Sequence, residues 1–144
     1  MTTANVDASQ PILGGSGIFE IAALAESLPG DTATLIVDRR LVERPDAGLR
    51  MFRVNSPVPR HLHAKSDEYL YTVLGAAKIA IGDQPAKLVT AGQLAFIERG
   101  TWHAVVEIVE APFVVMAFEV PARDPNDVVF FDAVAGNFIS AYGE

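Results

Sequence analysis

The chain has 144 residues but only three histidines, and two of these are separated by a single residue. In an extended strand, His61 and His63 would point to the same face, with their side chains about 6–7 Å apart. Two imidazoles in this arrangement can bind one metal ion, and His103 offers a third further along the chain. The absence of cysteine excludes a thiolate metal site, a cysteine nucleophile and a disulfide framework.

Glu68 follows the histidine pair at the start of a predicted strand. Alternate residues of a strand point to opposite faces, so the position of Glu68 decides whether its side chain can meet the two imidazoles. In one unbroken strand Asp67, and not Glu68, would share the face of His61 and His63. Glu68 faces the histidines only if residues 64–67 form a turn that resets the register. The Lys-Ser-Asp sequence within this segment is suited to such a turn.

Two spaced motifs around these residues resemble the two motifs of the cupin superfamily. The first reads His61-x-His63-x4-Glu68-x6-Gly75. The second reads Gly92-x7-Gly100-x2-His103. The sequence departs from the family pattern at Asn55, Glu98 and Glu107, none of which is among the family's metal ligands.

The resemblance implies a small jelly-roll barrel that binds one divalent metal ion, with Fe, Mn, Ni, Cu and Zn all compatible with nitrogen and oxygen ligands. The ligands it implies are His61, His63, Glu68 and His103. Judged from the residues alone, the same four side chains could instead form a buried polar network without an ion.

Short apolar segments separated by Gly, Pro and Asp predict about eight antiparallel strands, which is typical of a sandwich or barrel. The predicted strands are 34–41, 49–55, 68–74, 77–81, 86–89, 94–97, 102–108 and 113–120. Together with the resemblance, this pattern predicts an all-β double-stranded β-helix (a jelly-roll barrel) with a short N-terminal helix over 18–28 and an apolar C-terminal tail. The expected organisation is an arm and helix over 1–31, the barrel over 32–121 and the tail over 122–144.

Arginines near the motifs are candidates for binding a substrate carboxylate. Arg50 and Arg53 stand three apart in one predicted strand, so they point to opposite faces, and one could look into the barrel. An inward arginine could clamp a substrate or pair with Glu107. Arg60 and Arg99 lie beside the motifs at the expected barrel mouth. The alternative is that these arginines only solvate the surface.

The walls of the pocket are also predicted by strand parity. Leu70 and Thr72 share the face of Glu68, and Phe96 and Val105 are expected to add apolar surface. The candidate substrate-binding residues are therefore Arg50, Arg53, Arg60, Arg99, Thr72 and Phe96.

Composition narrows the classes of partner. The net charge of −7, with seven acids and one base over residues 107–144, disfavours nucleic-acid binding. No apolar run reaches the roughly 20 residues of a membrane span, and the N-terminus does not resemble a secretory signal, so we expect a cytoplasmic protein. The positive mean hydropathy of +0.26 and an apolar tail favour a homodimer.

The function that these features favour is a metal-dependent enzyme acting on a small organic acid or related metabolite, by oxygenase, isomerase, lyase or decarboxylase chemistry. The expected ligand is a small carboxylate; a neutral sugar or phenol is the alternative. A non-catalytic binding or sensor protein is the second hypothesis, and an interaction module with a vestigial pocket is the third. An additional acid or base beside the metal would favour the enzyme, whereas purely apolar walls would favour binding.

Overall fold

A computed structural model of the chain describes residues 16–30 and 33–131. Its elements are α1 (Ile21–Ser27), β1 (Ile36–Arg44), β2 (Ala47–Val54), β3 (Val58–Leu62), β4 (Asp67–Ile81), β5 (Lys87–Thr90), β6 (Leu94–Ile97), β7 (His103–Val120) and β8 (Val129–Phe130). In this part of the chain, no helix has the length and apolar character required to cross a membrane.

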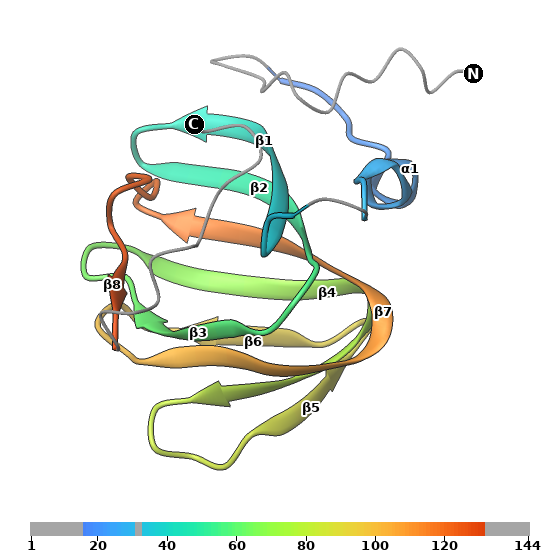
Figure 1. Cartoon of the computed structure of the whole chain (residues 1–144). Helices are drawn as coiled ribbons and strands as arrows, with labels where there is room; N and C mark the ends of the chain where they lie inside the picture. The colour runs from blue at the N-terminus through green and yellow to red at the C-terminus, as the bar shows by residue number, and fades with distance from the viewer. Residues whose placement is uncertain (1–15, 31–32, 132–144) are drawn as a thin grey trace.

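Two long strands, β4 and β7, hold the barrel together. The second half of β7 pairs with β2 and with the first half of β4, and its first half pairs with β3 and the second half of β4. The remaining strands add at the edges, β1 to β2, β5 and β6 to β4, and β8 to β3. The sheet thereby folds over into two layers (Figure 1), and the predicted double-stranded β-helix is confirmed.

The expected boundaries within β4 and β7 are wrong, because each pair of predicted strands is one continuous strand. Gly75 stands in the middle of β4 with a φ of +79°, which a residue with a side chain rarely adopts. A Cβ atom at this position would lie 2.1 Å from the carbonyl oxygen of Pro112 and 2.4 Å from that of Glu110. The glycine therefore bends β4 closely against β7 rather than ending the strand.

The apolar residues form two clusters. One fills the barrel between the layers, and the other lies beneath α1, where Leu24 and Leu28 cover Met51 and Val114. The helix is shorter than predicted and begins at Ile21. The N-terminal arm and most of the expected apolar tail, including Phe138, lie outside the described residues.

Candidate metal centre

The three histidines meet at one end of the barrel interior. His61 on β3 is the cross-strand partner of His103 on β7, and His63 follows just after the end of β3. All three are buried, with 5–6% of each residue exposed. One ring nitrogen from each lies within 4.8 Å of the others, which identifies the cluster as a possible metal site.

The backbone orients all three rings in the same way. The Nδ1 atoms face the carbonyl oxygens of Pro59, Asp127 and Thr101, at 2.7, 2.7 and 3.0 Å for His61, His63 and His103 respectively. Because a carbonyl oxygen only accepts hydrogen bonds, each Nδ1 carries the proton and donates it. Each Nε2 therefore keeps its lone pair, as required of a metal ligand.

Glu68 lies beside two of the three histidines because the chain turns between β3 and β4. The turn resets the register, so that Glu68 and not Asp67 is buried with the histidines. Its Oε1 atom lies 3.7 Å from His63 Nε2 and 3.5 Å from His103 Nε2. Two donors that each lie about 2.0–2.2 Å from one ion are separated by no more than about 4.4 Å, so Glu68 could share an ion with His63 and His103. Among the described residues, the donor group whose members all lie within 4.8 Å of one another consists of the three histidines without Glu68.

Burial keeps the imidazoles of His61 and His63 in the neutral form that binds metal. It lowers the pKa of His61 to about 3, with a further contribution from the neighbouring His103. It lowers the pKa of His63 to about 4. Burial also acts to raise the pKa of Glu68, but its polar neighbours His103, His63 and Arg50 outweigh this effect and hold the pKa well below its usual range. His61 and His63 therefore need not lose a proton in order to bind a metal ion.

Arg50 lies beside Glu68 at the centre of a buried group of charges that the sequence analysis did not identify. Its Nη1 atom lies 2.7 Å from Asp38 Oδ2, its Nε atom 2.8 Å from Glu119 Oε2, and its Nη2 atom 3.7 Å from Glu68 Oε2. Arg123 adds a second guanidinium, 3.4 Å from Glu119 Oε2. These three carboxylates and two guanidinium groups leave one negative charge in excess, which a divalent cation would offset.

Arg50 is thus the inward arginine of the predicted pair, but it pairs with Asp38 and Glu119 and not with Glu107. Glu107 is exposed and forms an ion pair with Lys78. The only sequence signal for this group was the presence of charged residues at buried positions of otherwise apolar strands.

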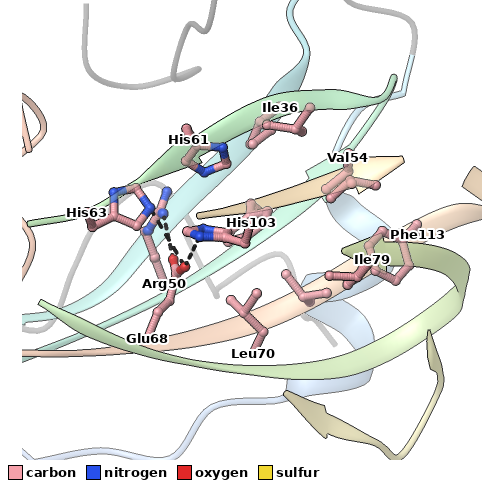
Figure 2. Close-up of a pocket in the computed structure, with 14 residues that line it drawn as sticks. Ile36, Arg50, Val54, His61, His63, Glu68, Leu70, Ile79, His103 and Phe113 are labelled. Atoms are coloured by element: carbon pink, nitrogen blue, oxygen red, sulfur yellow. Dashed lines mark ion pairs between the residues drawn. The ribbon is translucent and has the colours of Figure 1, made fainter. Parts of the chain in front are cut away.

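A cavity of about 40 Å³ extends from the histidines into the barrel, with space for more than one water molecule. Its walls are apolar and comprise Ile36, Phe52, Val54, Val58, Leu70, Ile79, Val105, Phe113 and Val115. Figure 2 shows the imidazoles, Glu68 and Arg50 at one end, with Leu70, Ile79 and Phe113 towards the other. Apart from Arg50, no side chain among the described lining residues adds an acid or base to the histidines and Glu68.

Leu70 and Val105 line the cavity as expected, whereas Phe96 does not. Phe96 is 48% exposed and packs on Tyr69 on the outer face of the sheet, because its neighbour Ile97 takes the inward position. Thr72 is buried and is not among the lining residues, and its hydroxyl group makes no hydrogen bond to any described residue.

The other three candidate arginines do not line this cavity. Arg53 points towards α1, where it lies 3.5 Å from the carbonyl oxygen of Leu28. Arg60 stacks on Phe131 at the surface, with its guanidinium carbon 5.1 Å from the ring centroid. Arg99 forms an exposed ion pair with Asp67.

Comparison with known proteins agrees with the fold. The sequence model of the family described as Cupin domain matches residues 49–119, which include both motifs. The chain resembles the solved structure of a conserved protein with a double-stranded beta-helix domain from Klebsiella pneumoniae (TM-score 0.65, 16% identity, covering 82% of this chain and 99% of that chain). It also resembles KdgF from Halomonas (TM-score 0.58, 20% identity, covering 65% and 87%).

A third similar structure is the nucleoside dehydratase Pac13 from Streptomyces (TM-score 0.59, 16% identity, covering 81% of this chain and 91% of that chain). At these identities the likeness shows the fold alone. No curated protein matches the sequence.

Proposed function

Because this chain belongs to the cupin superfamily, we propose that it is a metal-dependent enzyme that binds a small metabolite inside its barrel. The observation that carries the proposal is the common orientation of His61, His63 and His103: their Nδ1 atoms all face backbone carbonyl oxygens, and one ring nitrogen of each lies within 4.8 Å of the others.

The proposed ligands of the ion are the three histidines and Glu68. Once bound, a divalent Fe, Mn, Ni, Cu or Zn ion would supply Lewis acidity towards a carbonyl or carboxylate oxygen. The chain's own contribution is to hold four donors in a fixed arrangement and to exclude bulk water with apolar walls.

The shape and polarity of the cavity suggest the class of metabolite. Its apolar walls suit a compact apolar body, and an oxygen-bearing head group would face the metal site. We favour a carboxylate head, because a divalent cation added to the buried charges would leave that end of the cavity with one positive charge. Arg50 is already paired with carboxylates, so its contribution is to the local potential and not to a direct clamp.

One observation favours the alternative of a binding or sensor protein. Among the described residues that line the cavity, the ligand set and Arg50 are the only titratable groups. Catalysis would therefore depend on the metal and its ligands, without a separate acid or base.

The metal site is tested first, with tag-free protein reconstituted in turn with each of the five metals and measured by elemental analysis. We expect one equivalent per chain in the wild type and none in the double variant His61→Ala/His103→Ala. Glu68→Gln should lower the metal content, because it replaces the proposed carboxylate ligand with a neutral amide. Glu107→Gln is its matched control and should not, because Glu107 is an exposed glutamate outside the site. Unchanged metal content in the double variant would overturn the proposal.

The ligand is then tested by titrating metal-loaded protein with short alkyl and aryl carboxylates and with their neutral primary amides. We expect the carboxylates to bind at least tenfold more tightly, and equal affinity would contradict the carboxylate assignment. Analysis of the bound carboxylates for conversion, with and without oxygen, separates the two functions. Tight binding without conversion would favour the sensor.

We also propose that a second copy of the chain packs on the outer face of the layer that carries β6. Tyr69 stands between Phe96 and Phe118 across three strands, and Tyr71 lies opposite Leu94. All but Tyr69 are 38–58% exposed, and such a row of apolar side chains could form the centre of an interface of about 800 Å² per partner.

Light scattering at micromolar concentration should give twice the 15.4 kDa monomer mass. Phe96→Lys should reduce it to the monomer, whereas Leu88→Lys, which is 53% exposed on β5, should not. A monomeric wild type would exclude the dimer.

A further inference from the structure

The segment that follows β7 returns to the metal centre. Residues 122–131, here called the C-terminal strap, run from the end of β7 near the β1–β2 turn to the edge of β3, where β8 pairs with it (Figure 1). The strap lies entirely beyond residues 49–119, the part of the chain that matches the cupin family.

Asp127 is the residue of the strap that lies closest to the chemistry. Its backbone carbonyl oxygen accepts the hydrogen bond from His63 Nδ1 at 2.7 Å. Its carboxylate accepts two further bonds, from the backbone N–H groups of Ala64 at 2.8 Å and Lys65 at 3.0 Å. The residue is 8% exposed, so these bonds are shielded from water.

These three bonds fix two parts of the site: the ring of His63 and the turn that leads from His63 to Glu68. The bond to His63 fixes its tautomer and ring direction. The bonds to residues 64 and 65 hold the turn that resets the register between β3 and β4 and brings Glu68 to the histidines. One side chain and its own carbonyl therefore set the position of His63 relative to Glu68.

The strap is itself held at both ends. Arg123 donates a hydrogen bond to Glu119 within the buried charge group, and the N–H of Phe131 bonds to the carbonyl oxygen of Arg60. Between them, the N–H of Asp127 bonds to the carbonyl oxygen of Asp124 at 2.8 Å. Because both ends of the strap are anchored, the position of Asp127 is fixed.

We propose that Asp127 is a positioning residue for the metal centre, which it acts on through His63 and the turn to Glu68 without contacting the ion. This role rests on the proposed function, namely that the site binds a divalent ion. Loss of a partner that orients a ligand typically costs 10–100-fold in metal affinity.

The test uses tag-free, full-length protein and Co²⁺ as the probe, because its absorption spectrum reports the geometry of its ligands. The dissociation constant is measured by competition with a chelator, and the stability of each metal-free protein is measured by urea unfolding. Asp127→Ala keeps the backbone carbonyl that accepts the bond from His63 but removes both side-chain bonds to the turn that leads to Glu68. It should raise the dissociation constant 10–100-fold and change the Co²⁺ spectrum. Asp127→Asn, which keeps one oxygen acceptor for the turn, should raise it only about 3–10-fold.

Asp124→Ala is the matched control. It removes an exposed carboxylate from the same strap, where the Asp124 side chain accepts a hydrogen bond from the N–H of Asn126. We expect it to leave the dissociation constant and the spectrum unchanged. A folded Asp127→Ala with wild-type affinity, or an equal loss of affinity in Asp124→Ala, would overturn the positioning role.

If Asp127→Ala does not fold, Asp127→Asn decides the question, and an affinity within twofold of wild type with an unchanged spectrum would overturn the role. The wild-type titration reports separately on the proposed function. A wild type that binds no Co²⁺ and none of the other metals would overturn that function and the role of Asp127 with it.

Discussion

Arg50 is the cation on which the buried charges depend, and replacing it with methionine should destabilise the protein strongly. Methionine fills a similar volume, but it would leave Asp38, Glu68 and Glu119 with Arg123 as the one remaining guanidinium of the group. Removing one member of a buried ion pair typically costs about 3–5 kcal/mol, because the remaining charge loses its compensation. For a chain of this length, that corresponds to a decrease in Tm of about 10–20 °C.

The measurement is urea unfolding of metal-free wild type and Arg50→Met at pH 7, with Arg40→Met as the control. Arg40 pairs with Glu43 at the surface, where both side chains are partly exposed, so its replacement should cost no more than about 1 kcal/mol. A cost for Arg50→Met that equals the control would refute the reasoning. Adding Glu119→Gln to Arg50→Met should recover part of the loss, because it removes one uncompensated charge.

The pH dependence of the free energy of unfolding provides an independent check of the prediction for Arg50→Met. In the wild type, burial acts to raise the pKa of Glu68, but its neighbours, including Arg50, hold it below the unfolded value of about 4.3. Ionised Glu68 therefore contributes stability above that pH, and this stability is lost as the pH falls towards the folded pKa. Without Arg50, Glu68 loses one of the neighbours that lower its pKa, so it should take up a proton at a higher pH than in the wild type, and the difference between wild type and Arg50→Met should shrink as the pH falls below about 4.5. A constant difference would contradict this account.

Two further predictions concern the bend in β4 and the neutral histidines. Gly75→Ala should lower the free energy of unfolding in urea by at least about 3 kcal/mol or prevent folding, because its Cβ would overlap the Pro112 carbonyl oxygen. Gly92→Ala is the control, since Gly92 has a φ of +93° but no atom within 4 Å of the added Cβ, and it should cost about 1 kcal/mol. Equal costs would contradict the steric argument. Burial lowers the pKa of His61 to about 3 and that of His63 to about 4, so the unfolded chain binds protons at these histidines at a higher pH than the folded chain does. The stability of the metal-free protein should therefore fall as the pH decreases from about 6.5 to about 4.5. Melts followed by circular dichroism that show no such fall would refute this prediction.

The sequence was sufficient to predict the fold class and the residues that gather at the candidate site. Alternating apolar residues with Gly, Pro and Asp between them are local signals of antiparallel strands, and the antiparallel fold is confirmed. Four of the predicted strands merge into β4 and β7, and β3 and β8 were not among the predicted strands. The spacing of His61, His63 and Glu68 around a turn is also local, and the structure brings them together with His103.

The partners of these residues could not be predicted in the same way. Parity states that Arg50 and Arg53 face opposite sides of β2, but it does not state which side is inner. The choice depends on the pairing of β2 with β1 and β7, which places Arg50 between Asp38 and Glu119. Phe96 faces outward for the same reason, because the pairing of β6 with β4 leaves Ile97 on the inner face.

Asp127 is separated from His63 by 64 positions in the chain, and it meets the turn after β3 only because the strap folds back onto the barrel. Similarly, Gly75 reads as a strand end in the sequence, while in three dimensions it is the point where β4 bends against β7. Side-chain type and spacing thus determined which groups the site contains. The register between distant strands determined how these groups are oriented, charged and held, because it fixes contacts between residues that no local pattern connects.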